Sequence, residues 1–156
     1  MKWSVLVVVV AACGGDGGSP CGPSEAVVER VIDGDTIVVS GGRKIRYLLI
    51  DAPETTDGHD ACFGDSAAQF NADLVLGKAV QLTYDEVCDD RYGRALAYVT
   101  VGGIDVNRLL VARGYACVLH IPPDGDARAD EFAAVQAAAQ AAGLGVWGAC
   151  DPVPCR

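Results

Sequence analysis

The sequence lacks closely spaced cysteine pairs and long apolar runs, and it has little positive charge. These features argue against a zinc site, a membrane-spanning helix and a basic phosphate-binding surface. No two cysteines are separated by two residues, so the usual zinc-site pattern is missing. The chain has 12 Lys and Arg but 21 Asp and Glu, and the resulting net charge of −9 argues against a basic phosphate-binding surface. The apolar run VLVVVVAA is too short for a bilayer core of about 30 Å. The remaining pattern, 156 residues that are 51% hydrophobic and 6% aromatic, fits one compact domain.

The N-terminus and the cysteines indicate export. Seven cysteines are many for a chain of this length and indicate an oxidising compartment. Lys2 and the apolar run fit an export signal over residues 1–12. The signal ends at Cys13 in a sequence that resembles the cleavage box of bacterial lipoproteins, where this cysteine is lipidated. We therefore expect a cell-envelope lipoprotein, periplasmic or on the cell surface, or alternatively a plain secreted protein. Residues 13–24 are predicted to be a flexible tether.

Lipidation of Cys13 leaves an even number of cysteines, as a disulfide framework needs. The six are Cys21, Cys62, Cys88, Cys117, Cys150 and Cys155. We favour a bond between Cys62 and Cys88, and a bond from Cys21 to one of the C-terminal cysteines. The sequence leaves the connectivity open.

The hydrophobic patterning predicts short strands with a few helices. Strands are expected within 27–40 and over 43–50, 80–84, 95–101 and 115–120, and helices over 65–76, 106–113 and 128–142. Short, mostly antiparallel strands covered by helices are typical of a small closed barrel rather than a parallel α/β sheet. The expected domain covers residues 25–150, followed by a tail over 151–156.

The stretch Asp33-Gly34-Asp35 interrupts the first β-rich segment with two like charges. Asp-Gly between β-branched runs is a strong hairpin signal, because glycine supplies the positive φ of the turn. Gly41-Gly42 is a better hairpin turn, since it leaves long arms on both sides. We therefore favour a second explanation, in which a bound cation offsets the repulsion between two aspartates on one strand face.

Three segments hold the residues for such chemistry. Asp33, Asp35 and Asp51 would supply oxygen ligands to a hard cation such as Ca²⁺. Arg46 and Arg94 would grip a phosphate, because a guanidinium fork matches phosphate oxygens. Pro53 forces an extended turn that presents Glu54, which would take a proton from water. Together these are the parts of metal-assisted phosphodiester hydrolysis.

The segments VIDGDT, RYLLIDAPE and DRYGR, followed by VNRLLVARGYA, resemble the staphylococcal nuclease (thermonuclease) family over residues 27–147. The resemblance implies an α+β, mainly β fold: a five-stranded OB-fold barrel with three helices, here disulfide-bonded. It also implies Ca²⁺-dependent cleavage of DNA and RNA that leaves 3′-phosphates.

The resemblance assigns a role to each residue of the motifs. Asp35 and Asp51 match the calcium carboxylates, with the carbonyl of Ala52 as a further ligand and Asp33 as a supporting acid. Glu54 matches the general base, and Arg46 and Arg94 match the phosphate-binding arginines. Arg91 and Tyr92 fall where the family places substrate contacts.

The sequence departs from the family at three points. Ala52 replaces a threonine, but only its carbonyl is needed. His120 and Pro122 replace two tyrosines of the nucleotide pocket, so His120 is the expected substrate contact there and base stacking is altered. The scarcity of lysine implies weaker and more salt-sensitive binding.

Three functions remain to be weighed. The first is an exported, lipid-anchored, monomeric nuclease that acts on DNA, RNA or both. The second is a non-catalytic nucleic-acid-binding OB-fold module of the cell envelope, and the third is an envelope interaction protein whose acidic surface binds cations. Loss of Glu54 or of an arginine would favour the second, and none is lost. Distant negative charge is screened over ~8 Å at physiological ionic strength, so we favour the enzyme.

Overall fold

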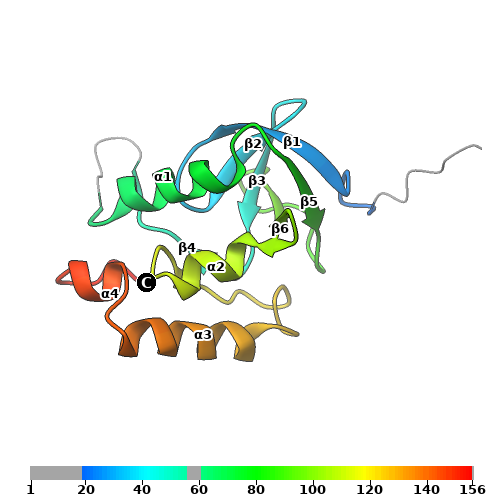
Figure 1. Cartoon of the computed structure of the whole chain (residues 1–156). Coiled ribbons are helices and arrows are strands. Elements are labelled where there is room, and N and C mark those ends of the chain that lie inside the picture. Colours follow the sequence, from blue (N-terminus) through cyan, green and yellow to red (C-terminus); the bar gives the residue numbers. More distant parts are fainter. Residues whose placement is uncertain (1–18, 56–60, 156) are drawn as a thin grey trace, which may run out of the picture.

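The computed structural model describes residues 19–55 and 61–155, and its centre is a closed barrel. The barrel strands are β1 (Glu25–Val31), β2 (Thr36–Val39), β3 (Arg43–Tyr47), β5 (Ala79–Thr83) and β6 (Ala95–Val101). They run in the order β3-β2-β1-β5-β6, and parallel pairing of β3 with β6 closes the ring (Figure 1). The predicted five-stranded barrel is confirmed.

Shorter strands and the helices lie around this barrel. The strand β7 (Ile104–Asp105) pairs antiparallel with the end of β6, and β4 (Ile50–Asp51) pairs with β8 (Cys117–Val118). The helices are α1 (Gly64–Val75), α2 (Val106–Ala112), α3 (Ala129–Ala141) and the single turn α4 (Val146–Ala149). The helix α2 lies against β6, between α1 and α3 (Figure 1). Three helices were predicted and α4 was not. Within the described residues, no helix combines the length and apolarity needed to cross a membrane.

Aliphatic side chains fill the barrel, and a buried tyrosine and asparagine among them are hydrogen-bonded to each other. Strand β5 alternates exposed and buried residues, as a strand with one face on the core must. Tyr47 is buried and donates its hydroxyl to Asn71 Oδ1 at 2.9 Å, while Asn71 Nδ2 donates to the carbonyl of Asp33 at 3.0 Å. These bonds attach α1 to both β3 and the turn after β1.

Residues 32–35 form the turn between β1 and β2, because Val31 pairs with Ile37. The prediction that Asp33 and Asp35 share a strand face is therefore wrong. The Asp33 side chain instead accepts a hydrogen bond from the Asp35 amide at 3.0 Å, which is the local turn that aspartate favours. Gly34 is required by close packing, since a Cβ there would lie 2.6 Å from that of Ala52. Turn and candidate site coincide in this stretch.

Two predicted strands are shorter than expected. The strand predicted over 43–50 divides into β3 and β4, because the chain turns at Leu48 and Leu49, where φ of Leu49 is 64°. The strand predicted over 115–120 retains only the two residues of β8.

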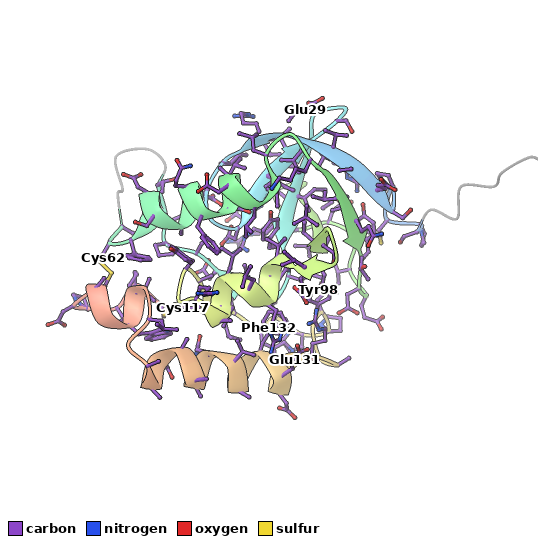
Figure 2. All side chains as sticks on the ribbon, viewed as in Figure 1. Glu29, Cys62, Tyr98, Cys117, Glu131 and Phe132 are labelled. Atoms are coloured by element: carbon purple, nitrogen blue, oxygen red, sulfur yellow. A yellow bond between two sulfur atoms is a disulfide. The ribbon has the colours of Figure 1, made fainter. Side chains whose placement is uncertain are left out.

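The disulfides join Cys21 to Cys88, Cys62 to Cys150 and Cys117 to Cys155. The predicted bond between Cys62 and Cys88 is wrong, and so is the bond from Cys21 to a C-terminal cysteine. Strand β1 runs antiparallel to β5, with Glu25 opposite Gln81, so residues before β1 lie beside those after β5. This register brings Cys21 to Cys88. Cys62 lies beside α4 at the opposite end of the molecule (Figure 2).

Some of the predicted segments lie outside the described residues, and two disulfides cross the predicted domain boundaries. The proposed signal over residues 1–12 and the proposed lipidation site Cys13 lie outside the described residues, as does half of the predicted tether. Cys21 and Cys155 lie outside the predicted range 25–150, yet each is covalently joined to it.

Candidate active site

A cleft of about 1020 Å³ contains most of the predicted site residues. We call Asp35, Arg46, Asp51 and Glu54 the barrel half of the cleft, because strands β2, β3 and β4 position them. We call Asp90, Arg91, Tyr92 and Arg94 the loop half, because they lie on the loop between β5 and β6. Residues far apart in the sequence therefore meet in one cleft.

Asp35 is the most deeply buried acid of the barrel half, at 4% exposure. Its Oδ1 accepts a hydrogen bond from the Thr36 hydroxyl at 2.9 Å, and its Oδ2 accepts one from the Ala52 amide at 2.6 Å. Burial raises the pKa of Asp35 to about 7, Arg46 acts to lower it, and nearby Asp33 raises it further. The fold thus buries a carboxyl group in surroundings that disfavour its ionised form.

Arg46 joins the two acids of the barrel half. Its Nη1 lies 3.2 Å from Asp35 Oδ2, and its Nη2 lies 3.0 Å from Asp51 Oδ1. The same Nη1 donates to the carbonyls of Tyr47 and Ile50 at 2.9 and 2.8 Å. The side chains of the three charged residues are only 6–12% exposed. Arg46 is thereby fixed against both carboxylates.

The carboxylates of Asp35 and Asp51 lie close enough together to contact one guanidinium, and burial disfavours the charged form of Asp35. Two such carboxylates suit a divalent cation, which would offset their negative charge. Ala52 lies next to them, because its backbone N–H donates a hydrogen bond to Asp35. Asp33 uses one carboxylate oxygen in the turn and does not line the cleft. Among the residues that the structure describes, no group of three His, Cys, Asp or Glu is arranged for a metal. Two carboxylates, with backbone, water or substrate oxygens completing the ligand set, are the kind of oxygen donors that a hard divalent cation takes.

Glu54 lines the same cleft and follows β4 by three residues. Its backbone carbonyl accepts a hydrogen bond from the Ala61 amide at 3.0 Å. The predicted base therefore shares the cleft with the carboxylate pair.

In the loop half, Asp90 organises the turn that carries Arg94. Its Oδ2 lies 2.7 Å from Arg94 Nε, while its Oδ1 accepts from the amides of Tyr92 and Arg94 at 2.9 and 3.0 Å. Burial acts to raise the pKa of Asp90, but the hydrogen bonds from Arg94 and Tyr92 outweigh it and hold that pKa below its ordinary value. Arg94 is thus oriented by a charged partner within its own turn.

Tyr92 is 68% exposed and lies between two arginines. The guanidinium carbons of Arg91 and Arg94 lie 4.8 and 5.4 Å from the centre of its ring, and Arg91 also donates to its hydroxyl at 2.6 Å. An exposed aromatic ring flanked by cations suits a nucleotide, which has a flat base and an anionic phosphate.

His120 does not line the cleft, although Leu119, Ile121 and Pro122 do. Its Nε2 lies 2.7 Å from Asp126 Oδ1. Its assignment as a substrate contact stays a prediction.

The sequence analysis did not identify Lys44 as a cleft residue, although it lines the cleft beside Arg46. The two lie two positions apart on β3, and side chains at that spacing share a strand face. That periodicity was the available signal.

Comparisons with known proteins agree with the fold and the cleft. Residues 44–149 match the family described as Staphylococcal nuclease homologue. The chain is 36% identical over 126 residues to Endonuclease YncB of Bacillus subtilis (strain 168), covering 77% of this chain and 60% of that protein. It is 35% identical to a Thermonuclease of Staphylococcus intermedius, covering 63% of this chain and 61% of that protein. It is 37% identical to an Uncharacterized endonuclease of Escherichia coli, covering 86% and 84%.

The chain thus spans less than two thirds of the first two of these relatives, but most of the third. The family match alone covers more than half of the 156 residues. On these grounds the chain belongs to the staphylococcal nuclease homologue family.

Proposed function

We propose that this protein is an exported, Ca²⁺-dependent nuclease that hydrolyses DNA and RNA to products with 3′-phosphates. The observation that carries the proposal is the convergence of Asp35, Arg46 and Asp51 within 3.2 Å contacts, in the cleft that Glu54 and Arg94 also line. Relatives named endonuclease and thermonuclease support phosphodiester hydrolysis.

The barrel half would carry the chemistry. Glu54 takes a proton from water, and the resulting hydroxide attacks phosphorus as the bond to the 5′-oxygen breaks and that oxygen gains a proton. Asp35 and Asp51 would hold Ca²⁺ with the carbonyl of Ala52, and the cation when bound supplies Lewis-acid stabilisation of phosphate charge. The guanidinium of Arg46, held by its bonds to the carbonyls of Tyr47 and Ile50, would add positive charge that stabilises a phosphate oxygen.

The loop half would bind the substrate. Arg94, oriented by Asp90, is proposed to stabilise charge on phosphate. Arg91 and Tyr92 are proposed to contact phosphate and base, with the exposed ring as a stacking surface. His120 is proposed to make at most a weak contact with substrate, because it is paired with Asp126 and does not line the cleft.

Other parts of the proposal rest on the sequence alone. Export follows from the N-terminal signal and is consistent with three disulfides among the described residues, which form in oxidising compartments. Anchoring through a lipid on Cys13 would place the enzyme on the cell envelope, and we propose that it acts as a monomer.

The experiment is a DNA and RNA degradation assay on the oxidised protein with Ca²⁺, with chelator, and with Glu54→Gln. Cys21 must be retained, since a chain beginning at Glu25 would leave Cys88 without its disulfide partner. We expect degradation only with Ca²⁺, and a loss of about 10²–10⁴-fold in kcat in the variant, which is the usual contribution of a general base. A folded parent that binds Ca²⁺ and nucleic acid but cleaves neither DNA nor RNA would make the protein a binding module instead.

A further inference from the structure

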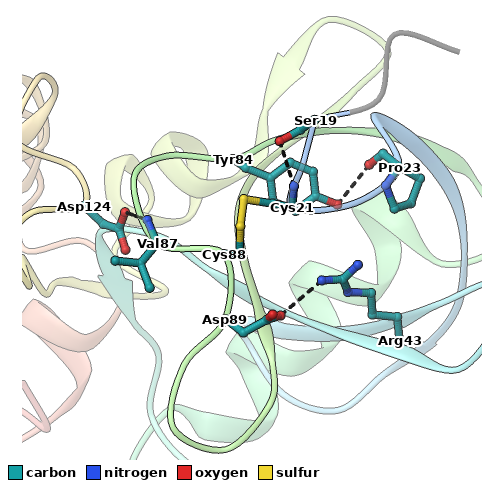
Figure 3. The surroundings of a disulfide bond; sticks show 9 residues. All are labelled: Ser19, Cys21, Pro23, Arg43, Tyr84, Val87, Cys88, Asp89 and Asp124. Atoms are coloured by element: carbon teal, nitrogen blue, oxygen red, sulfur yellow. Dashed lines mark hydrogen bonds and ion pairs between the residues drawn. A yellow bond between two sulfur atoms is a disulfide. The ribbon is translucent and has the colours of Figure 1, made fainter. Parts of the chain in front are cut away.

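The loop between β5 and β6 carries the loop half of the cleft and is attached to the rest of the protein from two sides. On one side lies the segment that precedes β1: Cys21 forms a disulfide with Cys88, and the Tyr84 hydroxyl donates to the carbonyl of Pro23 at 2.9 Å. On the other side, Asp124 Oδ1 accepts a hydrogen bond from the Val87 amide at 2.9 Å. Figure 3 shows both attachments meeting around Cys88.

Cys88 lies at the base of the turn that presents the arginines. Its carbonyl accepts from the Leu96 amide at 2.9 Å, and the next residue, Asp89, forms an isolated bridge with Ala95. The turn held by Asp90 follows directly. Because Cys21 is only 7% exposed, the disulfide joins the turn to a packed part of the protein rather than to a free end.

A further hydrogen bond joins this loop to the segment after Asp124, because Asp85 Oδ2 accepts from the Gly125 amide at 2.7 Å. An ion pair of this loop is weaker. Arg43 lies 3.1 Å from Asp89, but the two side chains are 34% and 48% exposed, and exposed ion pairs contribute little. The stronger restraints are therefore the Cys21–Cys88 bond and the hydrogen bonds of Asp124 and Asp85, of which the Asp124 carboxylate is only 6% exposed.

We propose that Cys21 and Cys88 are positioning residues of the nucleic-acid site: their disulfide holds Arg91, Tyr92 and Arg94 in the arrangement that binds substrate. This inference rests on the proposed nuclease function. A loop that is already ordered loses less conformational freedom when substrate binds, so the disulfide favours binding without touching the substrate. Glu54 and the carboxylate pair lie on the barrel half, so their chemistry does not depend on this bond.

The test compares Cys21→Ser/Cys88→Ser with Cys62→Ser/Cys150→Ser. The control disulfide spans 88 residues against 67, so its loss reduces stability by at least as much in the chain-entropy description. The first variant is expected to raise KM about tenfold with kcat changed less than about threefold, the cost of ordering a few side chains. It should also speed amide hydrogen exchange across residues 88–96, and the control should change neither quantity.

A second pair of variants tests the same loop with every disulfide intact. Asp124→Ala removes both the charge and the acceptor for the Val87 amide, whereas Asp124→Asn removes only the charge. If loop order governs binding, KM rises in Asp124→Ala above that of Asp124→Asn. If charge alone governs binding, the two variants are equal, and the proposal is contradicted.

Hydrogen exchange is measured without substrate, so it separates this proposal from the nuclease function. Unchanged exchange over residues 88–96 in Cys21→Ser/Cys88→Ser overturns the positioning role even if the parent is an active nuclease. An inactive parent overturns the proposed function, whatever the exchange shows. If the double serine variant does not fold, the Asp124 pair decides.

Discussion

The two halves of the cleft are held in place by different means. In the barrel half, the side chains of Asp35, Arg46 and Asp51 are at most 12% exposed; the arginine joins the two carboxylates, and paired strands position the set. The loop half has an aromatic ring that is 68% exposed, on a turn fixed by a disulfide, a local carboxylate and the hydrogen bonds of Asp124 and Asp85. Under the proposed function, the chemistry that needs a buried carboxylate lies on the barrel, and the contacts that adapt to different bases lie on the loop. Substitutions in the two halves should therefore differ in kind: losses of kcat and stability on the barrel, and losses of affinity on the loop.

The largest effect is expected from Arg46→Ala. It removes a fixed transition-state cation, at a cost of about 10³-fold in kcat. It also leaves Asp35 and Asp51 buried without their guanidinium, so unfolding free energy in chelator should fall by about 3 kcal/mol. Kinetics and thermal melts with and without Ca²⁺ measure both, and added Ca²⁺ should restore part of the stability.

The matched control is Arg30→Ala, an exposed arginine on β1 outside the cleft lining. It should leave kcat within about twofold of the parent, as surface substitutions usually do. Equal losses in the two variants would contradict a special role for Arg46.

An intermediate effect is expected from Asp90→Asn in the loop half. It removes the charged partner of Arg94 Nε, and KM should rise about tenfold, the value of a charge-assisted hydrogen bond of roughly 1.5 kcal/mol. Asp89→Asn is the control, since it removes the same charge from the same cleft but pairs only with exposed Arg43. Steady-state kinetics on a short DNA substrate should show at most a small change in the control. A fall in KM in both variants would mean that charge repulsion outweighs the orientation of Arg94.

A similar or smaller effect is expected from Tyr92→Ala. Base stacking on an exposed ring contributes roughly 1–3 kcal/mol, so affinity for single-stranded DNA should fall about tenfold, without a change in melting temperature. Tyr92→Phe keeps the ring and should retain most of the affinity. If both variants lose affinity equally, the hydroxyl contact with Arg91 matters and stacking does not.

The smallest effect is expected from His120→Ala, because this histidine pairs with Asp126 and does not line the cleft. KM should change less than about twofold, as at surface sites in general. A rise well above that in the same kinetic assay would place His120 in contact with bound substrate.

The barrel half was predictable from the sequence because its motifs lie on contiguous stretches. The segments around Asp35, Arg46 and Asp51 each carry their own turn or strand signal, and barrel closure brings them together. The role of Asp33 within the turn was not predictable from residue spacing, because it depends on a hydrogen bond from the Asp35 amide to the Asp33 side chain. The division of the predicted strand at Leu49 was not predictable either. Leu49 has a φ of 64°, and leucine is not a residue whose presence predicts a positive φ.

The restraints on the loop half could not be predicted without the register of the barrel. Cys21 reaches Cys88 only because Glu25 lies opposite Gln81, and sequence patterning gives strands but not their partners. The contact from Asp124 to Val87 likewise joins two loops with no shared motif. Local chemistry was visible in the sequence, and the long-range attachments of the loop were not.

The measurement that tests the central claim most directly is a calorimetric titration of Ca²⁺ into the oxidised parent and into Asp51→Asn. A cation held by Asp35 and Asp51 predicts saturable binding to the parent, and an affinity at least about tenfold lower in the variant, because one anionic ligand is lost. A folded parent that binds no Ca²⁺, or a variant that binds it as tightly as the parent, would contradict the barrel half as a metal site.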